Sequence, residues 1–356
     1  MNKRIRKRDI FKYLTVPVSV AMLWFYIYYT EGWDRIKQVF ANLDYRYVAL
    51  MMLYPLVDTF LNAVCVAYMR RPYQKGVPFY YTLHTTFIAS FWGAITPANM
   101  QIGMITQIAA ERTQGLSVGN STAIHFAHSL PQTIALLTKK IIMFFIAFNY
   151  LKQHLNFLFW VFFLADCLMG VVNVLIYFFV PRFDKLITAI VSFIMDMFGK
   201  LHVIKNVAEK KEKARGQILL LKSNMKSLKY TTKDWVITTL ICMIVQLIGC
   251  CSLYFRINAL HISLAYPYWL TVAIQTVGSG IISFLSCIPI PGQFGISETI
   301  SYVIDKPLLG IENINFSIIL GRLTGYYFPL LIYAIATAIP VHSGKHRLNM
   351  ERNDEL

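Results

Sequence analysis

The sequence predicts an all-α protein that crosses a membrane several times. The chain has 356 residues, 56% of them hydrophobic, and a mean hydropathy of +0.50, which is too apolar for an ordinary soluble domain. Several apolar runs are long enough to span about 30 Å of hydrocarbon at about 1.5 Å per residue. Two runs end in breaks that contain Pro or Gly, a pattern typical of the interrupted helices that line transporter sites. These observations together indicate a polytopic helical protein with a polar site inside the bilayer.

Eight apolar segments divide the chain into two membrane halves. The first half is 1–180, with a break at 96–99, and the second is 235–340, with a break at 289–295. Between them, 181–234 carries 12 Lys/Arg against 5 Asp/Glu and is predicted to be a basic, amphipathic cytoplasmic loop. Residues 341–356 form a predicted cytoplasmic tail. The segments are Tyr13–Tyr29, Tyr47–Met69, Phe79–Thr96, Ser121–Tyr150, Phe157–Val180, Trp235–Phe255, Tyr266–Ile288 and Ile314–Pro340.

The distribution of charge predicts the orientation of the chain. A formal net charge of +16 could indicate nucleic acid, but the basic residues lie beside apolar runs, as anionic headgroups and the positive-inside rule require. We therefore expect phospholipid rather than nucleic acid as the partner. Placing both termini, the central loop and the turns at Arg70 and Arg112 in the cytoplasm puts 25 of the 34 basic residues inside and 6 outside. The protein is thus expected in a plasma membrane.

This orientation fixes the parity of the crossings. Residues 79–112 must enter and leave from the cytoplasm, whereas residues 266–304 must enter and leave from outside. The sequence thus predicts two broken hairpins of inverted orientation, although Phe79–Thr96 is also long enough for a full crossing. Non-helical backbone at membrane depth needs protein or water to satisfy its polar groups, so we expect a polar cavity where the hairpin tips meet.

The second break has the residue types of an anion site. Pro289 and Pro291 stop the helix, Gly292 and Gly295 allow a tight reversal, and Ser297 and Glu298 open the next half-helix. The amides at such a helix start favour a phosphate. The plainer alternative is that Ser297 and Glu298 only cap the helix.

The motif residues resemble those of a known membrane family. The run Pro289-Ile290-Pro291-Gly292-Gln293-Phe294-Gly295-Ile296-Ser297-Glu298, the run Ile95-Thr96-Pro97-Ala98, and Arg322 with Gly325 are similar to motifs of the lysylphosphatidylglycerol synthase/flippase family, the membrane part of the multiple peptide resistance factors. The first motif departs from the family pattern, because Gln101-Ile102 stands where a glycine pair is common and only Gly103 is nearby. Bifunctional members add a soluble domain that uses aminoacyl-tRNA, and the resemblance covers the membrane part alone.

Charged residues inside apolar runs are further candidates. Arg322 lies eight residues into the last run, where a charge costs at least about 2.5 kcal/mol without a partner. Glu298 is the expected partner, either in a lipid-phosphate site or in a structural ion pair. Asp58 and Asp166 are equally open to a functional or a structural role. Gln101, Gln107 and Arg112 follow the first break and could donate to a headgroup, although a solvated cytoplasmic turn explains Arg112 as well.

Other polar and sulfur-containing residues have plainer interpretations. His125, His128 and Gln132 share a helix face, which could bind metal but more simply predicts a polar pore-lining stripe. Lys139 and Lys140 are expected to reach the outer interface. The cysteines lack metal-type or disulfide spacing and are interpreted as packing residues, so no metal or cofactor is expected. The six are Cys65, Cys167, Cys242, Cys250, Cys251 and Cys287.

The sequence thus favours a flippase-like protein that moves a phospholipid or a lipid-linked headgroup, anionic or aminoacylated, between leaflets. The candidate substrate-binding residues are Asp58, Thr96, Pro97, Gln101, Gly103, Gln107, Asp166, Pro289, Pro291, Gly292, Gly295, Ser297, Glu298 and Arg322. The alternatives are a phosphatidylglycerol lysyltransferase or a regulatory subunit of such a synthase. A homo-oligomer and a separate synthase are the other partners left open.

Overall fold

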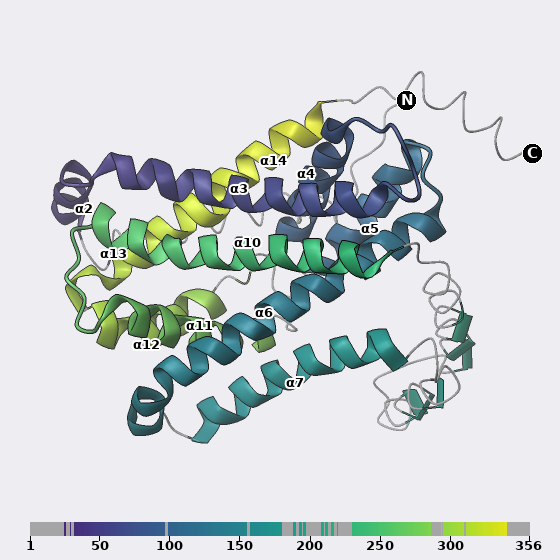
Figure 1. The fold of residues 1–356 in the computed structure, drawn as a ribbon. Coiled ribbons are helices and arrows are strands. Elements are labelled where there is room, and N and C mark those ends of the chain that lie inside the picture. The colour runs from purple at the N-terminus through teal and green to yellow at the C-terminus, as the bar shows by residue number, and fades with distance from the viewer. Residues whose placement is uncertain are drawn as a thin grey trace, which may run out of the picture.

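A computed structural model describes most of the membrane region. The described residues are 32–96, 99–154, 157–179, 230–285, 295–309 and 311–339, together with Phe25, Tyr29, Gln293 and short pieces between 188 and 219. Every secondary-structure element assigned in these residues is a helix (Figure 1), which confirms the predicted all-α class. The predicted first segment, most of the basic loop and the tail lie outside the described residues.

Twelve helical elements follow one another along the described chain. Four stretches are long and apolar enough to cross a membrane: α3, α6, α10 and the continuous stretch Ile314–Ala338. The helix α7 has a shorter apolar core, Trp160–Leu175. The bounds are α2 Trp33–Ala41, α3 Tyr45–Arg70, α4 Phe79–Ile95, α5 Asn99–Thr113, α6 Val118–His154, α7 Phe157–Phe179, α10 Thr232–Ala259, α11 Tyr268–Leu285, α12 Ile296–Leu309, α13 Ile311–Arg322, the π-helical η2 Leu323–Tyr327 and α14 Phe328–Ala338.

Polar caps set where the long helices begin. Asp44 accepts a hydrogen bond from the Arg46 amide at 3.0 Å and begins α3. Thr231 and Asp234 form a reciprocal capping box at the start of α10. Both helices therefore begin two or three residues before the apolar segments predicted for them, because a capping turn is polar and lies outside the hydropathy pattern.

The helices α3 and α10 run antiparallel and define the two ends of the bundle. The Asp44 amide donates to the Ala259 carbonyl at 3.1 Å, and the Tyr68 hydroxyl donates to the Asp234 carboxylate at 2.8 Å. The start of α3 therefore meets the end of α10, and the end of α3 meets the start of α10. We call these two sides the Ala259 end and the Arg70 end.

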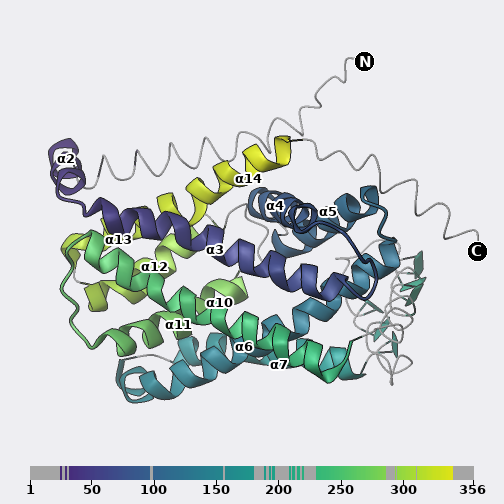
Figure 2. The same cartoon turned by 45° about the horizontal axis from the view of Figure 1, so that its top comes forward.

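The two broken hairpins open at opposite ends of the bundle. The base of α4/α5 is closed by a hydrogen bond from Gln114 Nε2 to the Tyr81 carbonyl at 3.3 Å, beside Arg70. The base of α11/α12 is closed by a hydrogen bond from the Ala265 amide to the Leu308 carbonyl at 3.2 Å, close to Ala259 in the chain. Figures 1 and 2 show the two hairpins toward opposite ends of the long helices. Their inverted orientation agrees with the parity predicted from the sequence.

The described membrane helices other than α7, which packs on α6 and α11, form two inverted units, each with a span, a hairpin and a second span. The first unit is α3, α4/α5 and α6, and the second is α10, α11/α12 and α13–α14. Each hairpin also packs against the other unit, because α4 contacts α14 and α11 contacts α6. The helix α10 lies against both α3 and α6 (Figure 2). The two units therefore pack against each other through these helices and share one bundle.

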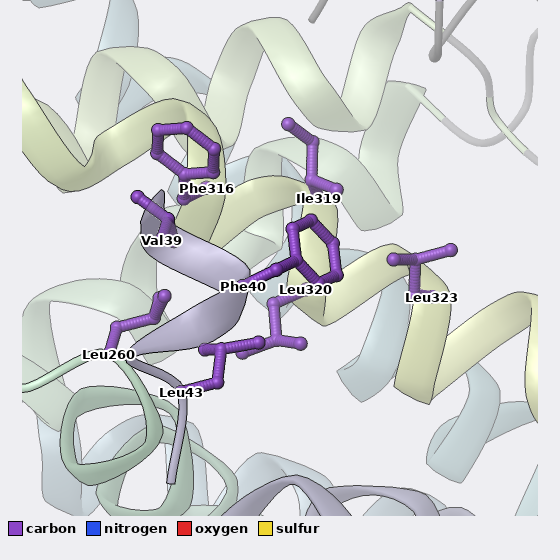
Figure 3. Close-up of a pocket in the computed structure, with 8 residues that line it drawn as sticks. All are labelled: Val39, Phe40, Leu43, Leu260, Phe316, Ile319, Leu320 and Leu323. Atoms are coloured by element: carbon purple, nitrogen blue, oxygen red, sulfur yellow. The ribbon is translucent and has the colours of Figure 1, made fainter. Parts of the chain in front are cut away.

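The short helix α2 covers the second unit at the Ala259 end. Its Ile36 is buried against Phe316 and Ile319. Next to this contact lies a small pocket whose lining is entirely apolar (Figure 3). Hydrocarbon fits such a lining, whereas a charged headgroup would lose its hydrogen bonds there. The lining residues are Val39, Phe40, Leu43, Leu260, Phe316, Ile319, Leu320 and Leu323.

Close contact between α4 and α5 depends on Gly103. A Cβ atom at this position would lie 2.7 Å from the Ala89 carbonyl oxygen, a backbone atom that cannot move aside alone. We expect Gly103→Ala to cost about 1–3 kcal/mol through overpacking, seen as a lower melting temperature of the purified protein. The control is Gly216→Ala, where a Cβ would meet nothing within 4 Å. Equal melting temperatures for the two variants would contradict this packing.

Candidate functional site

The tip of the second hairpin is bound to Arg322 of the last span. Arg322 Nε forms an ion pair with Glu298 Oε1 at 2.6 Å, which is the pairing the sequence predicts. Arg322 Nη2 also donates to the Ser297 hydroxyl and, at 3.5 Å, to the Gln293 carbonyl. The guanidinium group therefore contacts the break itself and the first turn of α12.

The first hairpin reaches the same part of the last span. The Tyr326 hydroxyl donates to the Ala94 carbonyl at 3.0 Å, just before the first break. The Arg322 guanidinium lies over the Tyr326 ring, 5.5 Å from its centroid. A chain of contacts therefore runs from one hairpin tip through Tyr326 and Arg322 to the other tip.

A π-helical turn forms this junction. The segment η2, Leu323–Tyr327, directly follows Arg322 and contains Gly325 of the third motif. Single π turns inside α-helices are rare and are frequent at functional sites. Arg322, just before the turn, and Tyr326, within it, contact different hairpins from one span.

Glu298 has two roles in the structure. Its Oε2 accepts a hydrogen bond from the Gly295 amide at 2.8 Å, the reach-back contact of a helix cap. Its Oε1 pairs with Arg322, so the capping interpretation and the site interpretation hold together. Gly295 has φ of +81°, the left-handed region that glycine adopts without strain. The side chains of Arg322 and Glu298 remain 15% and 21% exposed, so a ligand can reach them.

The other candidates around the breaks divide into two groups. Pro97, Pro289, Pro291 and Gly292 lie outside the described residues, as does the side chain of Gln101. The remaining three make contacts within the first hairpin. Thr96 donates to the Trp92 carbonyl at 2.6 Å, Gln107 Nε2 donates to Thr86 Oγ1 at 3.3 Å, and Gly103 packs on Ala89.

Asp166 and Asp58 belong to a second charged group, on α7, α6 and α3. Asp166 forms a buried ion pair with Lys140, which is only 4% exposed. The prediction that Lys140 reaches the outer interface is therefore wrong, because a carboxylate on the neighbouring helix holds it inside the bundle. Asp58 accepts from Asn62 Nδ2 at 3.3 Å within α3, and Lys139 is close enough to act on it electrostatically. These contacts do not include Arg322.

A buried polar network at the Arg70 end was missed by the sequence reasoning. Arg70 is 2% exposed and donates to Gln74 at 2.9 Å and to Gln114 at 3.1 Å. Glu111 is fully buried, accepts from the Ser121 hydroxyl and lies 3.0 Å from His125 Nε2. The sequence places Arg70 in a cytoplasmic turn but does not predict that Arg70 and Glu111 are buried there. A signal for this burial in the sequence is a glutamine shortly after each charged residue: Gln74 follows Arg70, and Gln114 follows Glu111.

The histidine face of α6 is buried and does not line a pore. His125 and His128 are 7% and 8% exposed. Their neighbours are side chains of α3, α5 and α10, so the predicted polar pore-lining stripe is wrong for these two residues. The histidines of α6 face α5 and α10, which pack against this side of the helix, and His125 lies beside Glu111 of α5.

A comparison with models of known protein families shows to which family the chain belongs. The model described as "Lysylphosphatidylglycerol synthase TM region" matches residues 11–332, which include both hairpins, Glu298 and Arg322. The chain belongs to this family. No curated protein and no solved structure gave a match.

Membership in the lysylphosphatidylglycerol synthase membrane family agrees with the motifs found in the sequence. It establishes a membrane protein related to lipid modification or lipid flipping. In this family member, Arg322 of the last span contacts Ser297 and Glu298 of the second motif. The family match thus covers the elements that the structure brings together.

We expect Glu298 and Arg322 to be energetically coupled. Glu298→Gln keeps an oxygen that can accept from Gly295 but loses the charge, and Arg322→Gln removes the partner charge. A double-mutant cycle in thermal unfolding should give an interaction energy of about 0.5–3 kcal/mol. The control is the exposed pair Lys211–Asp196, for which coupling should be near zero. Simple additivity at Glu298 and Arg322 would show that the ion pair does not form in the membrane.

Proposed function

We propose that this protein moves a phospholipid with an anionic or aminoacylated headgroup between the leaflets of a plasma membrane. The observation that supports this proposal most is the meeting of both hairpin tips at Arg322 and Tyr326. A guanidinium group binds phosphate oxygens through two parallel hydrogen bonds. The amides at the start of α12 favour the same anion.

Glu298 and a lipid phosphate would compete for Arg322. With no lipid present, the Glu298 carboxylate compensates the half-buried guanidinium charge, which would otherwise be costly in the bilayer. When a phosphate takes its place, the Gly295 amide still satisfies one oxygen of Glu298. The acyl chains stay in lipid, and the apolar pocket beneath α2 offers a surface suited to hydrocarbon.

Alternating access follows from the inverted hairpins. One hairpin separates Arg322 from the Ala259 end, and the other separates it from the Arg70 end. Small rotations of one unit against the other would open one route while closing the second, as in other inverted-repeat transporters. The contacts of α4 with α14 and of α11 with α6 would couple the two movements.

We assign the Arg70 end to the cytoplasm, because the basic residues concentrate on that side. Arg112 is exposed at this end, and Lys152 is exposed near the end of α6. In a cysteine-free background, Arg112→Cys should react with an impermeant maleimide only from the cytoplasm. Lys152→Cys should react only from outside. The reverse pattern would overturn the orientation, and with it the cytoplasmic location of the termini.

A transferase is the second candidate, because the family description names a synthase. A phosphatidylglycerol lysyltransferase changes the total amount of aminoacyl-lipid, whereas a flippase changes only its leaflet. A regulatory subunit would change the total amount only when a separate synthase is present. Expression in cells without lysyl-lipid, followed by total and leaflet-resolved lipid measurement, separates these activities. Synthesis of lysylphosphatidylglycerol that depends on this protein alone would favour the transferase.

Reconstituted flipping should depend on Arg322. Arg322→Gln removes charge-assisted hydrogen bonds worth about 1.5–3 kcal/mol, which corresponds to a rate about 10- to 150-fold lower at equal folding. Arg322→Lys keeps the charge without the planar fork and should retain part of the activity. The double variant Glu298→Gln/Arg322→Gln should regain stability but not flipping.

The matched control is Arg46→Gln, which removes an exposed arginine at the start of α3. This variant should flip a fluorescent anionic phospholipid in proteoliposomes at the parental rate. A parental rate in Arg322→Gln as well would make Arg322 structural and would exclude it from the transport site.

A further inference from the structure

Three buried side chains from separate helices meet near the Arg70 end. Cys65 of α3, His128 of α6 and Cys242 of α10 place one ligand atom each within 4.8 Å of one another. We propose that these residues form a binding site for a Zn²⁺ ion, independent of the lipid site at Arg322. Thiolate and imidazole are the ligands that Zn²⁺ uses most in proteins.

The state of His128 supports a ligand at this position. Its side chain is 8% exposed, and Nε2 has no hydrogen-bond partner among the described residues. Buried polar atoms are nearly always satisfied, and an orphan needs an explanation. The nearby groups of the cluster are the sulfur atoms of Cys65 and Cys242, which are 1% and 3% exposed and are poor hydrogen-bond partners. A metal ion would satisfy the nitrogen and both sulfurs at once.

The geometry needs little adjustment. Zn–S bonds of about 2.3 Å and Zn–N bonds of about 2.0–2.1 Å place ligand atoms roughly 4 Å apart around a three-ligand site. The cluster lies within 4.8 Å without an ion, so small rotations of the side chains would close it. Three protein ligands leave one position of a tetrahedral zinc site for a further ligand.

The charge balance favours Zn²⁺ over a monovalent ion. Binding deprotonates two thiols, so one Zn²⁺ enters as two protons leave. Two thiolates and a neutral imidazole then give a complex with no net charge. A neutral complex is the cheapest to bury in an apolar surrounding, whereas Cu⁺ with the same ligands would carry a net negative charge. The surrounding side chains Ala135, Ile241 and Met243 are apolar.

The position of the cluster gives the ion a structural consequence. Cys65 and His128 belong to the first inverted unit, and Cys242 belongs to the second. The site lies roughly 8–15 Å along the helix axes from the Arg70 end, about one turn deeper than the contact of His125 with Glu111. A bound ion would therefore tie the two units together on one side of the bundle.

Metal binding to the full chain, purified without a histidine tag, tests the proposal. After chelation and dialysis, we expect one Zn²⁺ per chain by elemental analysis. Co²⁺ loaded in its place should give a near-ultraviolet thiolate charge-transfer band. Zn²⁺ should also raise the melting temperature, because it binds only the folded state. Cys65→Ser, Cys242→Ser and His128→Gln should each lose the stoichiometric ion and the temperature shift.

The control variant is Cys250→Ser, which removes another buried cysteine of α10 that lies outside the cluster. It should keep one Zn²⁺ and the Co²⁺ band. The proposal is overturned if the parental chain binds no Zn²⁺, or if the cluster variants bind it as Cys250→Ser does. Comparison of melting curves without metal separates loss of the ion from loss of folding.

Discussion

An arginine within the last membrane span sets the constraint on which this architecture depends. A guanidinium charge at membrane depth is tolerated only when protein or water surrounds it. The interrupted backbone at the second break has a related need, because its polar groups cannot face lipid. Arg322 meets both needs by binding Glu298, Ser297 and the Gln293 carbonyl.

The remaining architecture follows from the need to hold these tips in place. Each hairpin enters and leaves the bundle at the same end, where contacts hold its base. Gln114 fixes the first base beside Arg70, and Ala265 fixes the second. The crossed packing of α4 on α14 and of α11 on α6 then joins the two units. The alternating access proposed above would move these joined units against each other.

The sequence predicted the helical class, the two breaks, their inverted orientation and the pairing of Glu298 with Arg322. These features have strong local signals: hydropathy, Pro and Gly at the breaks, and a charge in an apolar run. The burial of Arg70, Glu111 and Lys140 could not be predicted, because it depends on which helices pack together. The same holds for Cys65, His128 and Cys242, whose wide spacing in sequence hides their proximity. The chemical role of the candidate residues stays a prediction.

The location of the bound headgroup tests the central claim most directly. A cryo-EM structure in nanodiscs containing an anionic phospholipid would show whether a phosphate lies beside Arg322. The account predicts phosphate density within hydrogen-bond distance of the guanidinium group and of the first turn of α12, with Glu298 displaced from Arg322. An ordered headgroup at Lys140 and Asp166 instead, with Arg322 still bound to Glu298, would contradict it.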